Sequence, residues 1–206
     1  MFHLIEHPVI ATRLTRLRDA RCSPGEFRQL ADQVARLMVP AVTADLETDS
    51  TPVETPLEKS DGRILRHPIV LVPILRAGLG LCEGFLSLLP EARVAHIGLC
   101  RNEDTLEPDT YYYNAPLELP EAEVLILDPM LATGGSAAEA IRRLKEQGST
   151  RIRFVCLVAC PEGVTRLEGE HPNVPIYSAA LDRQLDDHGF IRPGLGDAGD
   201  RIFGTV

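Results

Sequence analysis

Four strand-like runs that lack regular polar alternation constrain the fold of this chain more than any other feature. They cover residues 69–75, 93–100, 123–127 and 152–159. A strand without such alternation is buried on both faces, which is typical of a parallel sheet covered by helices. Helical patterns lie between the runs, near residues 81–89, 136–147 and 161–170, and a short fifth strand is expected at 174–179. The sequence therefore predicts an α/β fold, a parallel sheet flanked by helices.

Ligands of such sheets bind at the carboxyl ends of the strands, so the residues that follow each run are the candidates for chemistry. Asp128 directly follows the third run, and Thr133-Gly-Gly-Ser136 leads from there into a predicted helix. Free N–H groups and the helix dipole at such a turn favour a phosphate, and glycines let its oxygens approach closely. Asp128 could then accept hydrogen bonds from two sugar hydroxyls. The alternative is an ordinary strand–turn–helix with Ser136 as the N-cap.

Two arginines stand at the carboxyl ends of other predicted strands. Arg76 follows the first run and Arg101 follows the second, so both are expected to project into the same crevice as Asp128. Their forked guanidinium groups suit a diphosphate, whereas a surface ion pair is the plain alternative for either one. No Lys follows the glycine turn, which disfavours the P-loop of ATPases and GTPases.

Two glycine patterns raise dinucleotide binding as a rival interpretation. Gly194-Leu-Gly-Asp-Ala-Gly199 matches G-x-G-x-x-G literally, but no apolar strand precedes it and only seven residues follow it. Gly78-Leu-Gly-Leu-Cys-Glu-Gly84 follows a strand and opens a helix, yet its third glycine comes one position late. The second pattern remains the more serious alternative on motif grounds.

The outer segments are less regular. Ser23-Pro-Gly-Glu26 predicts a helix start with a capping box, and Pro40 is expected to end that helix. Residues 47–67 are interpreted as a loop or short hairpin, and residues 101–121, which show no clear period, as a lid or arm. Tyr111-Tyr-Tyr113 within them could stack a base, pack internally or form a subunit contact. At 206 residues we expect one domain, with N-terminal helices and a loop or arm (1–67), a core sheet (68–180) and a C-terminal hood (181–206).

Charge and composition narrow the class of function. Lys and Arg number 21 against 30 Asp and Glu, which gives a net charge of −9 and argues against nucleic-acid binding. We find neither a membrane-spanning apolar run nor a secretory signal, so a cytoplasmic protein is expected. The five cysteines form no C-x-x-C pair and are interpreted as buried apolar side chains, and no metal-ligand spacing is present.

Taken together, these stretches resemble a known family. Asp-Pro-Met-Leu-Ala-Thr-Gly-Gly-Ser at 128–136 resembles the phosphoribosyl-diphosphate signature of type I phosphoribosyltransferases, in the form found in the uracil branch. Further stretches resembling that branch are Ala44–Thr48, Val72–Gly80, Arg101–Pro108, Pro161–Gly163 and Pro193–Thr205. The last stretch is specific to the uracil branch among phosphoribosyltransferases.

The resemblance implies transfer of the 5-phosphoribosyl group from 5-phospho-α-D-ribose 1-diphosphate (PRPP) to N1 of uracil, giving UMP and diphosphate. It implies four catalytic residues: Arg76, Arg101, Asp128 and Asp197. The implied PRPP-binding residues are Arg76, Arg101, Asp128, Pro129, Met130, Leu131, Ala132, Thr133, Gly134, Gly135, Ser136 and Asp197. The implied uracil-binding residues are Ile191, Gly196, Asp197 and Ala198.

The resemblance also implies Mg²⁺ carried on the PRPP diphosphate with few protein ligands, a homo-oligomer (dimer or tetramer), and GTP as a possible activator. The chain departs from the family pattern at Asn114, Asp186, Phe190 and Arg192, which leaves room for weak activity, altered regulation or a shifted base. Two other functions stay open. One is a pyrimidine-responsive RNA-binding regulator, which the acidic charge disfavours. The other is a catalytically silent relative, which the intact Asp128–Ser136 stretch disfavours.

Overall fold

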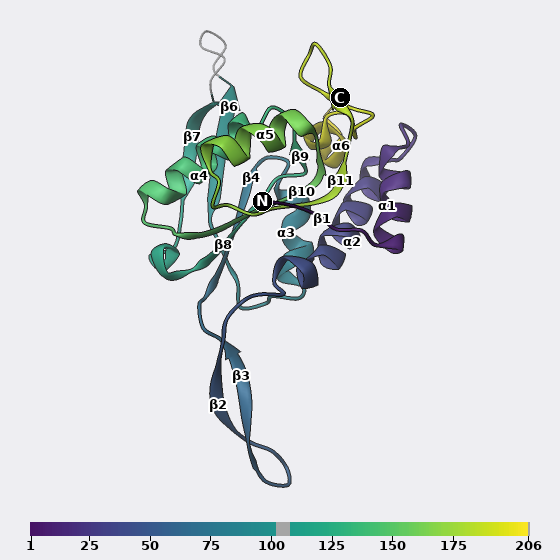
Figure 1. Cartoon of the computed structure of the whole chain (residues 1–206). Helices are drawn as coiled ribbons and strands as arrows, with labels where there is room; N and C mark the ends of the chain where they lie inside the picture. Colours follow the sequence, from purple (N-terminus) through teal and green to yellow (C-terminus); the bar gives the residue numbers. More distant parts are fainter. Residues whose placement is uncertain (102–107, 206) are drawn as a thin grey trace.

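A mostly parallel sheet forms the centre of the molecule and confirms the predicted α/β class (Figure 1). The structure, a computed structural model, describes residues 1–101 and 108–205, and of Arg101 and Pro108 only the backbone. The main strands, in spatial order, are β1 (Phe2–Leu4), β11 (Ile176–Leu181), β10 (Arg151–Ala159), β8 (Glu123–Leu127), β4 (Ile69–Leu75), β6 (His96–Arg101) and β7 (Pro108–Asn114). Two short strands complete the sheet, β5 (Arg93–Val94) beside β4 and β9 (Met130–Leu131) beside β10. Among the described strands of this sheet, only β7 runs antiparallel to its neighbour.

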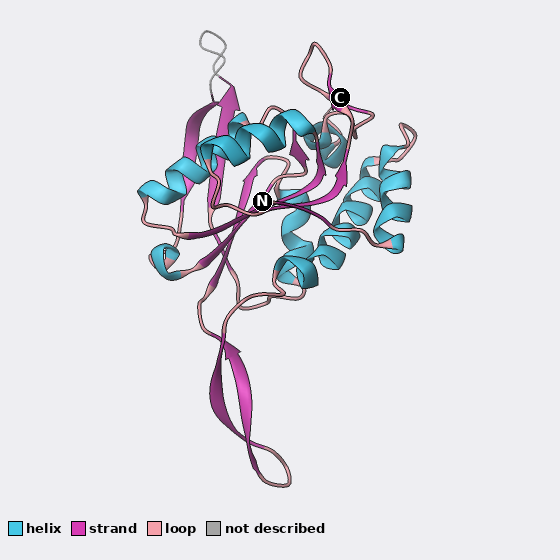
Figure 2. Ribbon diagram, viewed as in Figure 1, coloured by secondary structure: helices cyan, strands magenta, loops and turns pink. Residues whose placement is uncertain are grey.

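Helices cover both faces of this sheet, which explains the absence of polar alternation in its strands (Figure 2). The helices are α1 (Pro8–Arg18), α2 (Pro24–Val42), α3 (Leu79–Leu86), α4 (Gly135–Glu146), α5 (Pro161–Glu170) and α6 (Ala198–Phe203), with a 3₁₀ turn at Leu119–Glu121. Leu125 and Leu127 of β8 pack into one apolar cluster with α1, α2 and α3. Val124 and Ile126 point the other way, into a second cluster with α4 and α5.

The start of α2 follows the prediction, but its end does not. The Ser23 hydroxyl accepts a hydrogen bond from the Glu26 N–H at 3.3 Å, as an N-cap should. The Glu26 carboxylate pairs with Arg16 instead of closing a capping box. The prediction that Pro40 ends the helix is wrong, because α2 runs to Val42. Proline has a helical φ, so the helix continues for two more residues although Pro40 has no N–H to donate.

Two regions lacked a clear pattern and are hairpins in the structure. Residues 47–67 form an antiparallel pair, β2 (Thr48–Glu54) and β3 (Lys59–Leu65), which projects from the body as an arm (Figure 1). Residues 101–121, in which the sequence shows no clear period, contain β7, which pairs with β6. The polar residues at both ends of β7 interrupt the apolar pattern that would indicate a strand. Residues 102–107 of the expected lid or arm at 101–121 lie outside the described residues.

The C-terminal residues form a small separate layer over the end of the sheet. A two-stranded ladder joins β12 (Gln184–Leu185) to β13 (Ile191–Arg192), and α6 follows it. We refer to residues 181–206 as the hood. Within residues 1–101 and 108–205, the helices are all too short or too polar to span a membrane.

Candidate active site

A cavity of about 240 Å³ lies between the carboxyl ends of the central strands and the hood. Its lining residues are Ala77, Asp128, Met130, Ala132, Gly189, Phe190, Ile191, Gly196, Asp197, Ala198 and Gly199. The structure therefore brings part of the predicted PRPP-binding stretch together with all four predicted uracil-binding residues. Pro129 and Leu131 are buried and hold the stretch to the sheet, since the Pro129 carbonyl accepts from Leu157 and Val158.

Asp128 occupies the floor of this cavity. Its N–H donates to the Val155 carbonyl at 3.1 Å, which continues the ladder between β8 and β10. One carboxylate oxygen accepts a bond of 3.4 Å from the Met130 N–H. Burial raises the pKa of Asp128 to about 7, and the Met130 bond only partly opposes this shift. A hydroxyl-bearing ligand would supply the hydrogen bonds that the ionised carboxylate lacks.

The glycine turn after Asp128 presents main-chain donors at the N-terminus of α4. Gly134 is the N-cap, with φ of +78°, and its side-chain-free backbone leaves the cap without a side-chain hydrogen bond. Thr133 and Ser136 are exposed, and no acidic residue stands in the first turn. The alternative that Ser136 is the N-cap is wrong, because Ser136 lies inside the helix. This turn can bind a dianionic phosphate.

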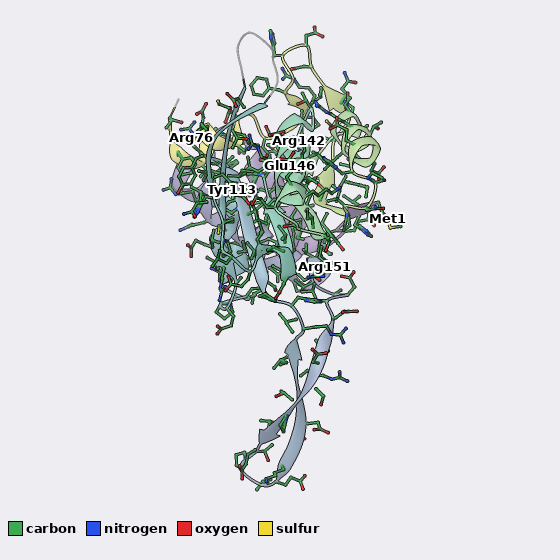
Figure 3. All side chains as sticks on the ribbon, turned by 90° about the vertical axis from the view of Figure 1, so that its left-hand side faces the viewer. Met1, Arg76, Tyr113, Arg142, Glu146 and Arg151 are labelled. Atoms are coloured by element: carbon green, nitrogen blue, oxygen red, sulfur yellow. The ribbon has the colours of Figure 1, made fainter. Side chains whose placement is uncertain are left out.

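Arg76 stands at the same end of the molecule, away from the arm (Figure 3). It directly follows β4, and its Nη2 lies 3.3 Å from the Asp200 carboxylate. Its guanidinium carbon lies 5.9 Å from the centre of the Phe203 ring, on the same helix as Asp200. The side chain is 56% exposed, so it can reach a ligand without breaking a buried contact. Arg101 ends β6, and its side chain lies outside the described residues.

Sequence reasoning missed Asp200. Besides Arg76, its carboxylate accepts a hydrogen bond of 2.6 Å from the Thr205 hydroxyl. Asp200 also follows Asp197, the N-cap of α6, whose carboxylate accepts from the Asp200 N–H at 2.9 Å. No periodic signal marks this residue, because its partner is 124 positions away along the chain.

The glycines behind the dinucleotide interpretation serve packing instead. A Cβ on Gly78 would lie 2.2 Å from the Leu127 carbonyl oxygen, and one on Gly84 would lie 2.6 Å from the Ala35 Cβ. Glycine is therefore needed where α3 approaches β8 and α2, without any nucleotide.

Two of the family departures are partners of each other. The Asp186 carboxylate accepts from Arg192 Nε at 2.7 Å and from the His188 and Phe190 N–H groups at 3.0 and 2.9 Å. Phe190 lines the cavity, whereas Arg192 is absent from its lining. The Arg192 charge is thus balanced by Asp186 at the tip of the β12–β13 hairpin.

Two carboxylates of the cavity could contribute to binding a magnesium ion that a phosphate-bearing ligand brings with it. The described residues hold no group of three or more His, Cys, Asp and Glu side chains that could bind a metal. Asp128 and Asp197 both line the cavity and offer carboxylate oxygens. Magnesium commonly takes one or two carboxylates and completes its shell with phosphate oxygens and water.

Comparisons with known proteins agree with this geometry. The family model described as "Uracil phosphoribosyltransferase" matches residues 4–205. A protein of that name from Macrococcus caseolyticus is 52% identical over 98% of both chains. The solved structure of AQ2163 protein from Aquifex aeolicus is 36% identical, with a TM-score of 0.94 over 98% of both chains. Adenine phosphoribosyltransferase from Trypanosoma brucei shares the fold, at 13% identity and a TM-score of 0.59 over 87% of this chain and 83% of that one. The chain belongs to the uracil phosphoribosyltransferase family.

Proposed function

We propose that this chain transfers the 5-phosphoribosyl group of PRPP to N1 of uracil, releasing UMP and diphosphate in pyrimidine salvage. One observation carries the proposal: a single cavity joins Asp128 and Ala132, which leads into the glycine turn, to Ile191 and the Gly196–Ala198 loop of the hood. The first pair suits a phosphorylated sugar. The second presents mostly main-chain groups, which suit the planar, doubly polar edge of a pyrimidine.

The residues act by positioning and by electrostatics. The glycine turn holds the 5-phosphate, and Asp128 accepts hydrogen bonds from the ribose hydroxyls. The anomeric carbon then loses diphosphate, which leaves with the electron pair of the C–O bond, and N1 of uracil forms the new C–N bond as it loses its proton. The transition state has oxocarbenium character. Arg76 exchanges Asp200 for diphosphate oxygens and stabilises the leaving charge. Arg101 is proposed to share this role, and Asp197 to face the same diphosphate.

Magnesium is proposed to be bound to the PRPP diphosphate beside Asp128 and Asp197, where it would neutralise part of the leaving-group charge. The hood and the sheet would enclose the anomeric carbon of bound PRPP between them. Enclosure matters because water would otherwise hydrolyse PRPP in competition with uracil.

The proposal is tested by incubating the purified protein with radiolabelled uracil, PRPP and Mg²⁺. UMP should form from uracil, while cytosine and hypoxanthine should give little product. Absence of UMP with retained PRPP binding would contradict the assignment of the base and direct attention to Phe190 and Arg192 in the hood. Initial rates with and without GTP test the predicted activation, and cell fractionation tests the cytoplasmic location.

A homo-oligomer is part of this proposal, and the arm supports it. An isolated two-stranded hairpin is marginally stable in water, yet the β2–β3 arm extends from the body without a helix to cover it (Figure 3). Leu57 near its tip is 95% exposed, and Ile64 is 53% exposed. A largely apolar cavity of about 550 Å³ at its base also contains Leu88. Sedimentation equilibrium should give a dimer or tetramer, and a monomer would contradict this part.

A further inference from the structure

Two arginines fix the main chain that leads into the Gly196–Ala198 loop. Arg18 Nη1 donates to the Gly194 carbonyl at 3.0 Å, and Arg201 Nη1 donates to the next carbonyl, that of Leu195, at 2.8 Å. Arg18 is the last residue of α1, whereas Arg201 lies within α6. The chain is thus held on both sides of the loop, immediately before it by the two carbonyls and after it through the helix that carries Arg201.

The Arg18 contact is part of a buried ion pair. Its two terminal nitrogens each lie 2.7 Å from one oxygen of Asp182, whose side chain is 7% exposed. Asp182 Oδ2 also accepts from the Gly194 N–H at 2.8 Å. One ion pair therefore engages both polar groups of the Gly194 backbone. A Cβ there would lie 2.1 Å from the Ile191 carbonyl oxygen, so the tight turn accepts only glycine.

Arg201 is bound to main chain and not to a carboxylate. Besides Leu195, it donates to the carbonyls of Leu17 at 2.5 Å and Asp19 at 2.7 Å, at the C-terminal end of α1. That end of a helix carries partial negative charge, which stabilises a cation. The guanidinium also lies 4.4 Å from the centre of the Phe27 ring in α2. Arg28 of α2 donates to the Ile202 carbonyl of α6 at 2.7 Å, so the α1–α2 pair supports the whole helix (Figure 1).

We infer that Arg18, Asp182 and Arg201 are positioning residues that set where the Gly196–Ala198 main chain lies in the cavity, and thereby set the selectivity for the base. The inference rests on the proposed function. A side chain can change rotamer to follow a ligand, whereas a main-chain group must already stand in place. The platform for base recognition is therefore the C-terminal end of α1, whereas the sugar phosphate is proposed to bind at the turn into α4.

The test compares Arg201→Lys and Asp182→Asn with the unaltered protein in uracil and cytosine assays. Each variant keeps the approximate size of the side chain but loses part of the contact set. The KM for uracil should rise about tenfold or more, which is the loss expected when charge-assisted contacts no longer hold the loop. The KM for PRPP should stay within about twofold, and the preference for uracil over cytosine should fall.

Two control variants separate positioning from stability. Ile10→Val removes one methyl group from the buried face of α1 and should lower Tm without changing the KM for uracil. Arg16→Lys alters an exposed arginine of α1 that pairs with Glu26 and should change neither quantity appreciably. If Asp182→Asn does not fold, Arg18→Lys replaces it, because lysine keeps the charge and loses the fork.

The outcomes are distinct. A raised KM for uracil in the hood variants, with an unchanged KM for PRPP, supports the inference. If the hood variants have the same KM for uracil as the Ile10→Val control at the same loss of Tm, the inference is overturned and the proposed function is left intact. No turnover of uracil by the unaltered protein overturns the proposed function, and the inference with it.

Discussion

The two walls of the cavity are built in opposite ways. The sheet wall consists of Asp128, Met130 and Ala132, which follow a strand that is fully buried along its length and lead into the glycine turn. The hood wall consists of residues 189–191 and the loop at 196–199, and arginine side chains connect the hood to α1. The buried core fixes the positions of the residues in the sheet wall. The hood wall depends on a few polar contacts, so changes there should alter ligand selectivity before they alter the fold.

Arg76→Ala should have the largest effect, because it removes a cation from the leaving-group side of the cavity. We expect kcat/KM to fall, and the fall should correspond to a loss of about 2–4 kcal/mol of transition-state stabilisation, because charge-assisted contacts to diphosphate would be lost. The same loss is predicted for Arg101→Ala. Steady-state kinetics with uracil and PRPP measure it. Arg36→Ala, an exposed arginine paired with Asp32 on α2, is the control and should keep normal kinetics. Near-normal kinetics in both Arg76→Ala and Arg101→Ala would contradict the assignment of the two arginines to the diphosphate site.

Gly134→Ala tests the glycine turn that continues from the sheet wall. A side chain at φ of +78° costs about 1–2 kcal/mol, and the added Cβ would lie 3.1 Å from the Gly163 carbonyl oxygen. The turn should shift, and the KM for PRPP should rise more than the KM for uracil.

Gly169→Ala in α5 is the matched control for Gly134→Ala. A Cβ at Gly169 meets no atom within 4 Å, so the change should raise Tm slightly through helix propensity. Equal kinetics for the two glycine variants would argue against a phosphate at the turn.

The free energy of unfolding should depend on pH through the titration of Asp128. Its folded pKa of about 7 lies above the value of about 3.9 in an unfolded chain. Between these values the folded protein keeps a proton that the unfolded chain has lost, so the free energy of unfolding falls as pH rises from about 4 to about 7. The contribution should be on the order of 1 kcal/mol, because a cavity residue retains some contact with water. Urea titrations at several pH values measure it, and a slope unchanged in Asp128→Asn would assign the dependence to other groups.

Arg192→Ala should have the smallest effect. The ion pair with Asp186 is exposed on the arginine side, at 58%, and such pairs contribute about 0–1 kcal/mol. The KM for uracil should change less than about threefold, since the Asp186 carboxylate still accepts from the Phe190 N–H. A change in base preference as large as that expected for Arg201→Lys would show that Arg192 itself contacts the base.

The same contrast explains which parts of the molecule could be predicted from sequence. The run at 123–127 and the turn at 133–136 are local signals of burial and conformation, and both lie where the pattern indicates. The predicted helix end at Pro40 is wrong by two residues, because a proline in the last turn of a helix does not stop the final residues from keeping a helical conformation. The three-residue β1 and the tyrosine-rich β7 lie at the two edges of the sheet, where strands are short or half polar and leave no clear period.

The hood could be assigned only through family resemblance. Its strands have two residues each, which is too short for any periodicity. The contacts that hold it join residues more than 160 positions apart, such as Arg18 with Asp182 and Arg201 with Leu17. The pairing of Asp186 with Arg192 is likewise a contact in three dimensions that neither departure from the family pattern indicates by itself.

Calorimetric binding of UMP and of ribose 5-phosphate tests most directly whether one cavity has two independent walls. Each ligand should bind one site per chain. Gly134→Ala should weaken both ligands by a similar factor, whereas Arg201→Lys should weaken UMP and leave ribose 5-phosphate unchanged. Equal weakening of both ligands by Arg201→Lys, or UMP binding insensitive to Gly134→Ala, would contradict the division of the site into a sugar-phosphate wall and a base wall.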